Sequence, residues 1–204
     1  MQGDYSKRTS FRDELLRRIG RNVVNFQFLE SILRDMIPTL SLQTTYPSKH
    51  AQSVKTKQKA KKDTLGILAG TFLDGIFYSS NVDVAESIEE VHEITLTSKF
   101  QIDADTEKIA ERKKGLLRLV VERNKLIHRE VLKVDLNSEE QCQCLSEKLD
   151  EQNDRIRENL MFLNNIRKAQ REIYLELSRY IQTDEFVTAF LSAKQSDTND
   201  KEHQ

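Results

Sequence analysis

The chain has 204 residues, of which 37% are hydrophobic and 32% charged, and only 6 are glycine and 2 proline. So few helix-breaking residues in a charge-rich chain predict long helices, and this length favours one domain over two. The 32 basic residues nearly balance the 33 acidic ones, so the net charge of -1 excludes a global field that would attract nucleic acid or a membrane. We expect a single helical domain over residues 1–193 and a disordered polar tail over residues 194–204.

No apolar run reaches the roughly 18 to 20 residues that span a bilayer, and residues 1–10 hold no signal-peptide core. We therefore expect a cytoplasmic protein without a membrane partner. Cys142 and Cys144 are too few and too close together for a disulfide framework, and we interpret them as reduced and incidental. The 4 histidines fit no zinc-ligand spacing, so neither a metal nor another cofactor is predicted.

The first predicted helix covers residues 12–37, where apolar residues recur every three or four positions. Pro38 ends this helix, because proline lacks the amide hydrogen that a continuing helix needs. Residues 39–62 lose the period and carry several lysines, so we expect a solvated basic loop there. Asp63 is placed to cap the helix that follows.

The next two predicted elements differ in their period. Residues 64–78 carry apolar side chains at helical spacing and predict a second helix, whose glycines weaken it or let a neighbour approach closely. Between residues 93 and 102, apolar and polar residues alternate, which indicates a short strand or extended segment.

A third helix is predicted over residues 105–132 and a fourth over residues 138–181. Asn137 and Ser138 can cap the fourth helix, and so short a connection makes the two helices antiparallel neighbours. The whole pattern predicts an all-α fold, an antiparallel bundle of four to five helices with one short extended segment near residues 93–102.

The third predicted helix has an unusually wide apolar surface. Its apolar residues cover an arc of about 240° on an ideal helix, whereas a helix lying on one core needs only somewhat over about 100°. We therefore expect residues 105–132 to contact both their own bundle and a second copy of the chain, as a homodimer. The residues of this arc are Leu116, Leu117, Leu119, Val120, Val121, Leu126, Ile127, Val131 and Leu132.

Three polar residues, Arg123, Asn124 and His128, fall inside this arc, where burial is expected. An unpaired buried guanidinium is very costly, but one that faces a partner or a substrate anion in a shared cleft forms strong charge-assisted bonds. A structural alternative pairs Arg123 with a carboxylate such as Glu130 and bonds Asn124 to His128. The polar residues expected on the solvent side are Arg118, Glu122, Lys125 and Arg129.

Residues 122–128, with the sequence ERNKLIH, contain R-N-x-x-x-H, which resembles the R-x(4 to 6)-H motif of the HEPN family (higher eukaryotes and prokaryotes nucleotide-binding domains). The polar residue directly after the arginine, the position late in a helical domain and the apolar helix around the motif strengthen the resemblance. One departure is Glu130, which stands where some antitoxin-paired members have a tyrosine. Regulation through modification of that tyrosine is therefore in doubt.

The resemblance implies a bundle of four or five helices that dimerises through the motif helices and forms a composite cleft. Many such proteins are metal-independent endoribonucleases that act as toxins or in phage defence, and others keep the fold without the chemistry. In this chain the resemblance implies that His128 is the general base or acid, Arg123 the phosphate clamp, and Asn124 the residue that orients the imidazole or contacts phosphate. An ideal helix separates Arg123 from His128 by about 140°, so a long arginine side chain, a local kink or the partner chain must complete the site.

We expect a dimeric HEPN ribonuclease that cleaves RNA to 2′,3′-cyclic phosphate, with an antitoxin or another regulatory protein as a further candidate partner. The alternative is a non-catalytic HEPN scaffold that binds a nucleotide or another protein, and a third alternative is a purely structural helical protein. The lysines of the basic loop either add attraction for the RNA backbone or are only solvated. They are Lys55, Lys57, Lys59, Lys61 and Lys62.

Overall fold

The computed structural model of the chain describes residues 2–46, 63–78, 94–186 and 188. The chain separates into two compact units, residues 1–163 and 164–204. A single domain over residues 1–193 stays a prediction, and the predicted tail over residues 194–204 lies outside the described residues. In the second unit, the ring of Tyr180 meets the ring of Phe186 edge to face, with 5.5 Å between the ring centroids.

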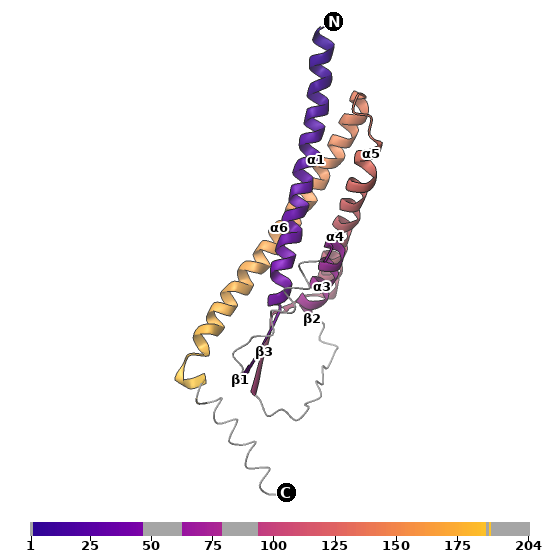
Figure 1. Ribbon diagram of the computed structural model, residues 1–204. Helices are drawn as coiled ribbons and strands as arrows, with labels where there is room; N and C mark the ends of the chain where they lie inside the picture. Colours follow the sequence, from indigo (N-terminus) through magenta and orange to yellow (C-terminus); the bar gives the residue numbers. More distant parts are fainter. Residues whose placement is uncertain (1, 47–62, 79–93, 187, 189–204) are drawn as a thin grey trace. The chain divides into compact units, whose positions relative to one another are not determined.

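Long helices build the first unit, and the all-α fold predicted from the sequence is confirmed. They are α1 (Gln2–Met36), α4 (Thr106–Lys125) and the part of α6 (Glu139–Tyr180) that ends at residue 163. In Figure 1, α1 and α6 run in the same direction and α4 runs opposite to both. The shorter helix α3 (Leu65–Ile76) packs against α1 and α4. None of the helices in the described ranges is long and apolar enough to cross a membrane.

Proline and serine set two of the helix ends, as predicted. α1 gives way to a 3-10 turn, η1 (Ile37–Thr39), with Pro38 near its start, because proline has no amide hydrogen to continue the α-helical bonds. At the start of α6, the Ser138 hydroxyl accepts a bond from the Gln141 amide at 3.3 Å. The short connection before it makes α4 and α6 antiparallel, and Arg112 of α4 bonds Glu158 of α6 at 2.9 Å.

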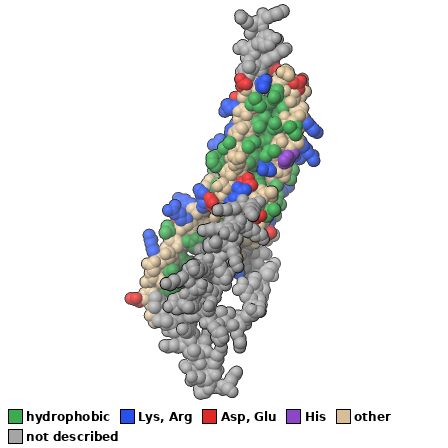
Figure 2. Space-filling view, in the orientation of Figure 1, with side chains coloured by type: hydrophobic (Ala, Val, Ile, Leu, Met, Phe, Trp, Pro, Cys, Tyr) green, Lys and Arg blue, Asp and Glu red, His purple; other side chains and the backbone are tan. Residues whose placement is uncertain are grey.

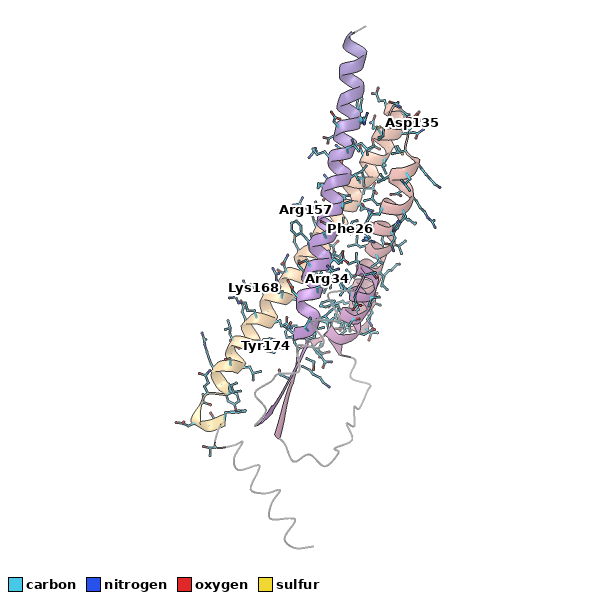
Figure 3. All side chains as sticks on the ribbon, viewed as in Figure 1. Phe26, Arg34, Asp135, Arg157, Lys168 and Tyr174 are labelled. Atoms are coloured by element: carbon cyan, nitrogen blue, oxygen red, sulfur yellow. The ribbon has the colours of Figure 1, made fainter. Side chains whose placement is uncertain are left out.

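The cap of α3 differs from the prediction. Asp63 was expected to cap this helix, but the cap position is Thr64, which makes no capping bond through its side chain. The helical bonds begin where the Leu68 amide donates to the Thr64 carbonyl at 3.0 Å. The Asp63 carbonyl instead accepts a bond from the Arg34 guanidinium at 3.2 Å, which ties the chain before α3 to the end of α1. Figure 3 labels Arg34 on α1.

Two short pairs of strands lie at one end of the helices. The extended segment predicted near residues 93–102 is present as β3 (Ile94–Lys99), which pairs antiparallel with β1 (Ser41–Tyr46). β2 (Phe77–Tyr78) pairs parallel with β4 (Ile102–Asp103). The sequence predicted the start of a loop where β1 lies. The residues that pair with β1 are 48 to 58 positions away along the chain, so they leave no local signal.

α1, α3, α4 and α6 all contribute buried side chains to the core of the first unit. α3 contributes most densely for its length, and Phe72 at its centre has no exposed surface. Gly75 confirms the close approach expected for this helix, since a Cβ atom there would lie 3.0 Å from Leu40 Cδ1. The most buried large side chains of this unit are Phe72, Leu15, Leu29, Leu33, Met36, Leu65, Leu68, Ile76, Leu119, Leu126, Leu149 and Ile156.

Amide side chains fix the register of α1 against α6. Asn22 has no exposed surface, and its Nδ2 donates to the Leu149 carbonyl at 2.8 Å and to Gln152 Oε1 at 3.0 Å. One turn further, Asn25 Nδ2 donates to Asn153 Oδ1 at 2.9 Å. A buried amide that loses its partner costs free energy, so these bonds disfavour any slip of one helix along the other.

We predict that Asn22→Leu lowers the free energy of unfolding by about 1 to 3 kcal/mol, because it leaves the buried Gln152 amide without its donor. Adding Gln152→Leu should restore part of that loss, since both polar partners are then replaced by apolar groups. Urea unfolding of the two variants measures the difference. If Asn22→Leu alone is as stable as the parent, the amide pair does not hold the two helices in register.

Candidate functional site

The helix that carries the motif changes its winding at the motif itself. α4 ends at Lys125, a π-helical turn η2 covers Leu126–Glu130, and α5 (Val131–Lys133) completes what we call the motif helix, residues 106–133. The Val131 amide donates to the Leu126 carbonyl five residues earlier, which is the π-helical bond. The extra residue in this turn is a local distortion of the kind expected to help complete the site, and such π-turns are frequent at functional sites.

The side of the motif helix that faces solvent combines apolar residues with two of the three motif residues. Leu117 and Val121 are 48% and 51% exposed, and Asn124 follows them at i+7 and is also exposed. Positions i, i+4 and i+7 share one face of a helix, and His128 continues as an exposed residue one turn later. Within one chain, Asn124 and His128 are therefore not buried, contrary to expectation, because no other helix in the described part of the first unit covers this face.

Arg123 lies toward the opposite side of the same helix. Its neighbours on that side, Leu119 and Leu126, are 1% and 0% exposed, and Arg123 itself is half-buried. Its Nη1 donates to Asn124 Oδ1 at 3.1 Å, a bond between consecutive residues. Arg123 and His128 therefore do not share a face within one chain, as the helix geometry predicted.

The described residues do not form the side-chain pairs that a purely structural role for the motif would require. Across the ranges that the structure describes, Arg123 forms no ion pair, with Glu130 or with any other carboxylate, and Asn124 forms no bond with His128. In the same ranges, the His128 imidazole makes no hydrogen bond at all. The guanidinium and the imidazole thus keep most of their donors for groups outside the chain.

Glu122, directly before Arg123, anchors the motif helix to α6. It was expected on the solvent side, but its side chain is only 14% exposed, because both Arg155 of α6 and Arg118 bond to it. Arg155 Nε lies 3.1 Å from Glu122 Oε1, and Arg118 Nε lies 2.8 Å from the same atom. This network holds in place the helical turn that carries Arg123. Because Arg155 is far from Glu122 along the chain, residue patterns did not indicate that Glu122 is buried.

Figure 2 shows hydrophobic side chains, in green, gathered over the upper part of the described helices, with histidine in purple and basic side chains in blue at the border of this area. A groove between α4 and α6 lies further along the helices and is polar. Its lining residues are Glu111, Arg112, Gly115, Arg118, Arg155, Glu158 and Asn159. The motif residues thus lie on an open surface and not in the groove.

The remaining sequence candidates are the two cysteines, possible metal ligands and the lysines of the basic loop. Cys142 and Cys144 are free, and burial raises the pKa of the Cys142 thiol, with the Asp135 carboxylate adding to the rise, so this thiol is a poor nucleophile. Within the described part of the chain, no three His, Cys, Asp or Glu side chains converge as metal ligands. The five lysines of the predicted basic loop, from Lys55 to Lys62, lie outside the described residues.

We predict that Arg123→Ala and His128→Ala change the free energy of unfolding by less than about 1 kcal/mol, since neither removes the partner of a buried carboxylate. The matched structural variant Arg155→Ala should cost about 1 to 3 kcal/mol, because it removes a charged partner from Glu122, whose side chain is only 14% exposed. Thermal and urea unfolding of the three variants separate these cases. If Arg123→Ala is as destabilising as Arg155→Ala, Arg123 is a structural residue.

A scan against family models, a search of curated proteins and a search of solved structures each find no match to this chain. The resemblance of residues 122–128 to the HEPN motif is therefore a likeness in one helix. What can be concluded about function depends on the geometry of Arg123, Asn124 and His128.

Proposed function

We propose that this chain is a metal-independent endoribonuclease of HEPN type, acting in the cytoplasm as a toxin or in phage defence, with an active site built by two copies of the chain. The observation that carries the proposal is the state of the motif residues. His128 is exposed and makes no bond within the described chain, and the half-buried Arg123 is bonded only to Asn124 there. Groups that are kept without a partner in one chain are available to a substrate.

A second copy of the chain is the partner that best fits the exposed face of the motif helix. Leu117 and Val121 expose about half of their surface in line with Asn124, and Leu132 at the end of the same helix is 78% exposed. An apolar strip of this kind favours association, and a two-fold interface brings the same strip of both copies together. The two His128 side chains would then lie near each other and near the axis.

The chemistry follows from what the two side chains can donate and accept. One imidazole takes the proton of an RNA 2′-hydroxyl, whose oxygen attacks the adjacent phosphorus. The bond from phosphorus to the 5′-oxygen breaks, and the same imidazole, now protonated, returns the proton to that oxygen. The products are a 2′,3′-cyclic phosphate and a 5′-hydroxyl, and the Arg123 guanidinium stabilises the extra negative charge on the phosphorane.

A non-catalytic scaffold is the second candidate, and one observation favours it. The motif residues of a single chain line an open surface, whereas enzyme sites are usually concave. In the scaffold, the same face would hold a nucleotide or a regulatory protein such as an antitoxin. The two candidates differ in one product, because only the enzyme leaves RNA ends that carry a cyclic phosphate.

We predict that the chain is a homodimer and that Val121→Glu makes it monomeric, because two carboxylates would face each other across the axis. The matched control is Ile67→Glu on α3, since Ile67 is 53% exposed and Val121 is 51% exposed. Sedimentation velocity at micromolar concentration measures both variants. A monomeric parent, or equal dissociation in the control, contradicts a dimer through the motif helix.

We predict that His128→Ala and Arg123→Ala each lower the rate of RNA cleavage by on the order of 10² to 10⁴ while the unfolding curve stays unchanged. Cleavage is measured with an all-RNA oligonucleotide in excess chelator, and mass spectrometry identifies the cyclic phosphate. A parent that leaves the RNA intact rejects the enzyme and favours the scaffold.

Mixing the two inactive variants tests whether both copies build one site. If Arg123 of one copy acts with His128 of the other, a mixed dimer of Arg123→Ala and His128→Ala contains one complete site and recovers about half of the parent rate in the fraction of dimers that is mixed. If both residues act within one copy, every dimer in the mixture stays inactive. The second result would exclude the shared site and keep the enzyme.

A further inference from the structure

Positive charge is concentrated on the motif helix. Between Lys114 and Lys133 the sequence has six basic residues and two acidic ones, a local excess of four positive charges, whereas the whole chain has a net charge of -1. A chain that is nearly neutral overall has no general attraction for anions, so an excess of this size on one helix marks a particular surface.

Most of these cations are free of ion pairs. Across the described ranges, Lys114, Lys125, Arg129 and Lys133 are all exposed or nearly so and pair with no carboxylate. Elsewhere on the first unit, exposed arginines are commonly paired, as Arg17 is with Glu14 at 2.7 Å. Like charges four residues apart on one helix repel each other, so an anion that lies beside them lowers their free energy.

The spacing of the cations aligns them along the helix beside the motif. Lys114, Arg118 and Lys125 stand at i, i+4 and i+11, which is one side of a helix, and Arg129 and Lys133 continue at steps of four through the π-turn and α5. Each step of four residues advances about 6 Å along an ideal helix. This side borders the exposed strip of Asn124 and His128, so an anionic chain lying on the cations passes the motif.

We propose that Lys114, Lys125, Arg129 and Lys133 form a track that binds the phosphates of single-stranded RNA and leads the strand to His128; the inference rests on the proposed ribonuclease function. Lysine is depleted in protein interfaces, whereas lysine and arginine supply the sequence-independent affinity for a nucleic-acid backbone. A repeating row of cations suits a ligand with a repeating row of phosphates better than it suits the scattered carboxylates of an acidic protein. Arg118 takes part less, because Glu122 holds it at 2.8 Å.

Fluorescence anisotropy with a short single-stranded 2′-O-methyl oligouridylate tests the track in the full-length chain. This probe has the phosphates of RNA but no free 2′-hydroxyl, so binding is measured whether or not the chain cleaves RNA. The test variant combines Lys125→Gln, Arg129→Gln and Lys133→Gln. The control variant removes as many charges from exposed positions of α6 by combining Arg157→Gln, Lys168→Gln and Arg171→Gln; Figure 3 labels Arg157 and Lys168.

The test variant should bind about tenfold or more weakly at low salt, and the slope of log affinity against log salt should fall by about 2, since each lost contact to a single strand removes about 0.7. The control should keep the slope and affinity of the parent. An unchanged slope in the test variant, or an equal loss in the control, overturns the track. Binding of poly-glutamate as tight as that of the oligouridylate, through the same cations, also overturns it and assigns the surface to an acidic protein.

The two proposals fail in different ways. If the parent cuts RNA and the test variant binds and cuts as the parent does, the track is wrong and the ribonuclease stands. If the parent binds the probe through these cations but leaves all-RNA substrates intact, the ribonuclease is wrong and the RNA-binding track stands.

Discussion

Leu116, Leu119 and Leu126 are at most 3% exposed, and their burial fixes how the motif helix is rotated about its own axis. Because these positions face the core, the face that starts at Leu117 and Val121 must face solvent. The bonds from Arg118 and Arg155 to Glu122 hold the same rotation with polar groups. The exposure of the motif surface is thus a consequence of how the other side of the helix packs.

The π-turn at Leu126–Glu130 begins at the last of the three buried leucines that fix the rotation of the motif helix, so it reorients only the residues that follow. An additional residue in one turn shifts the residues behind it around the axis, so α5 presents different side chains from those that an undistorted helix would. The turn leaves Leu126 fully buried while His128, two residues later, is exposed. A distortion that contains both a core residue and a candidate catalytic residue can set the orientation of the imidazole relative to the core.

The surface around the motif consists of three neighbouring strips of one helix, which differ in their side chains. The apolar strip offers contact area to a second copy, the motif residues offer unpaired donors, and the adjacent cations offer attraction for phosphates. The polar ladder of Asn22 and Gln152 keeps α1 in register with α6, against which the motif helix packs. Rigid support of this kind allows an open surface to keep a defined geometry.

Four features were predictable from residue patterns alone: the helices, the helix ends at Pro38 and Ser138, the extended segment near residue 94 and the wide apolar arc of the motif helix. These features depend on local spacing and on residues a few positions apart. The sequence also singled out Arg123, Asn124 and His128, whose roles stay predictions. Residue patterns did not predict that Glu122 turns inward, that β1 is a strand or that the motif helix contains a π-turn, and these features were found in the folded chain. Arg155 and β3 are partners far along the chain, and no glycine or proline marks the π-turn. No local pattern of residues could therefore predict these three features.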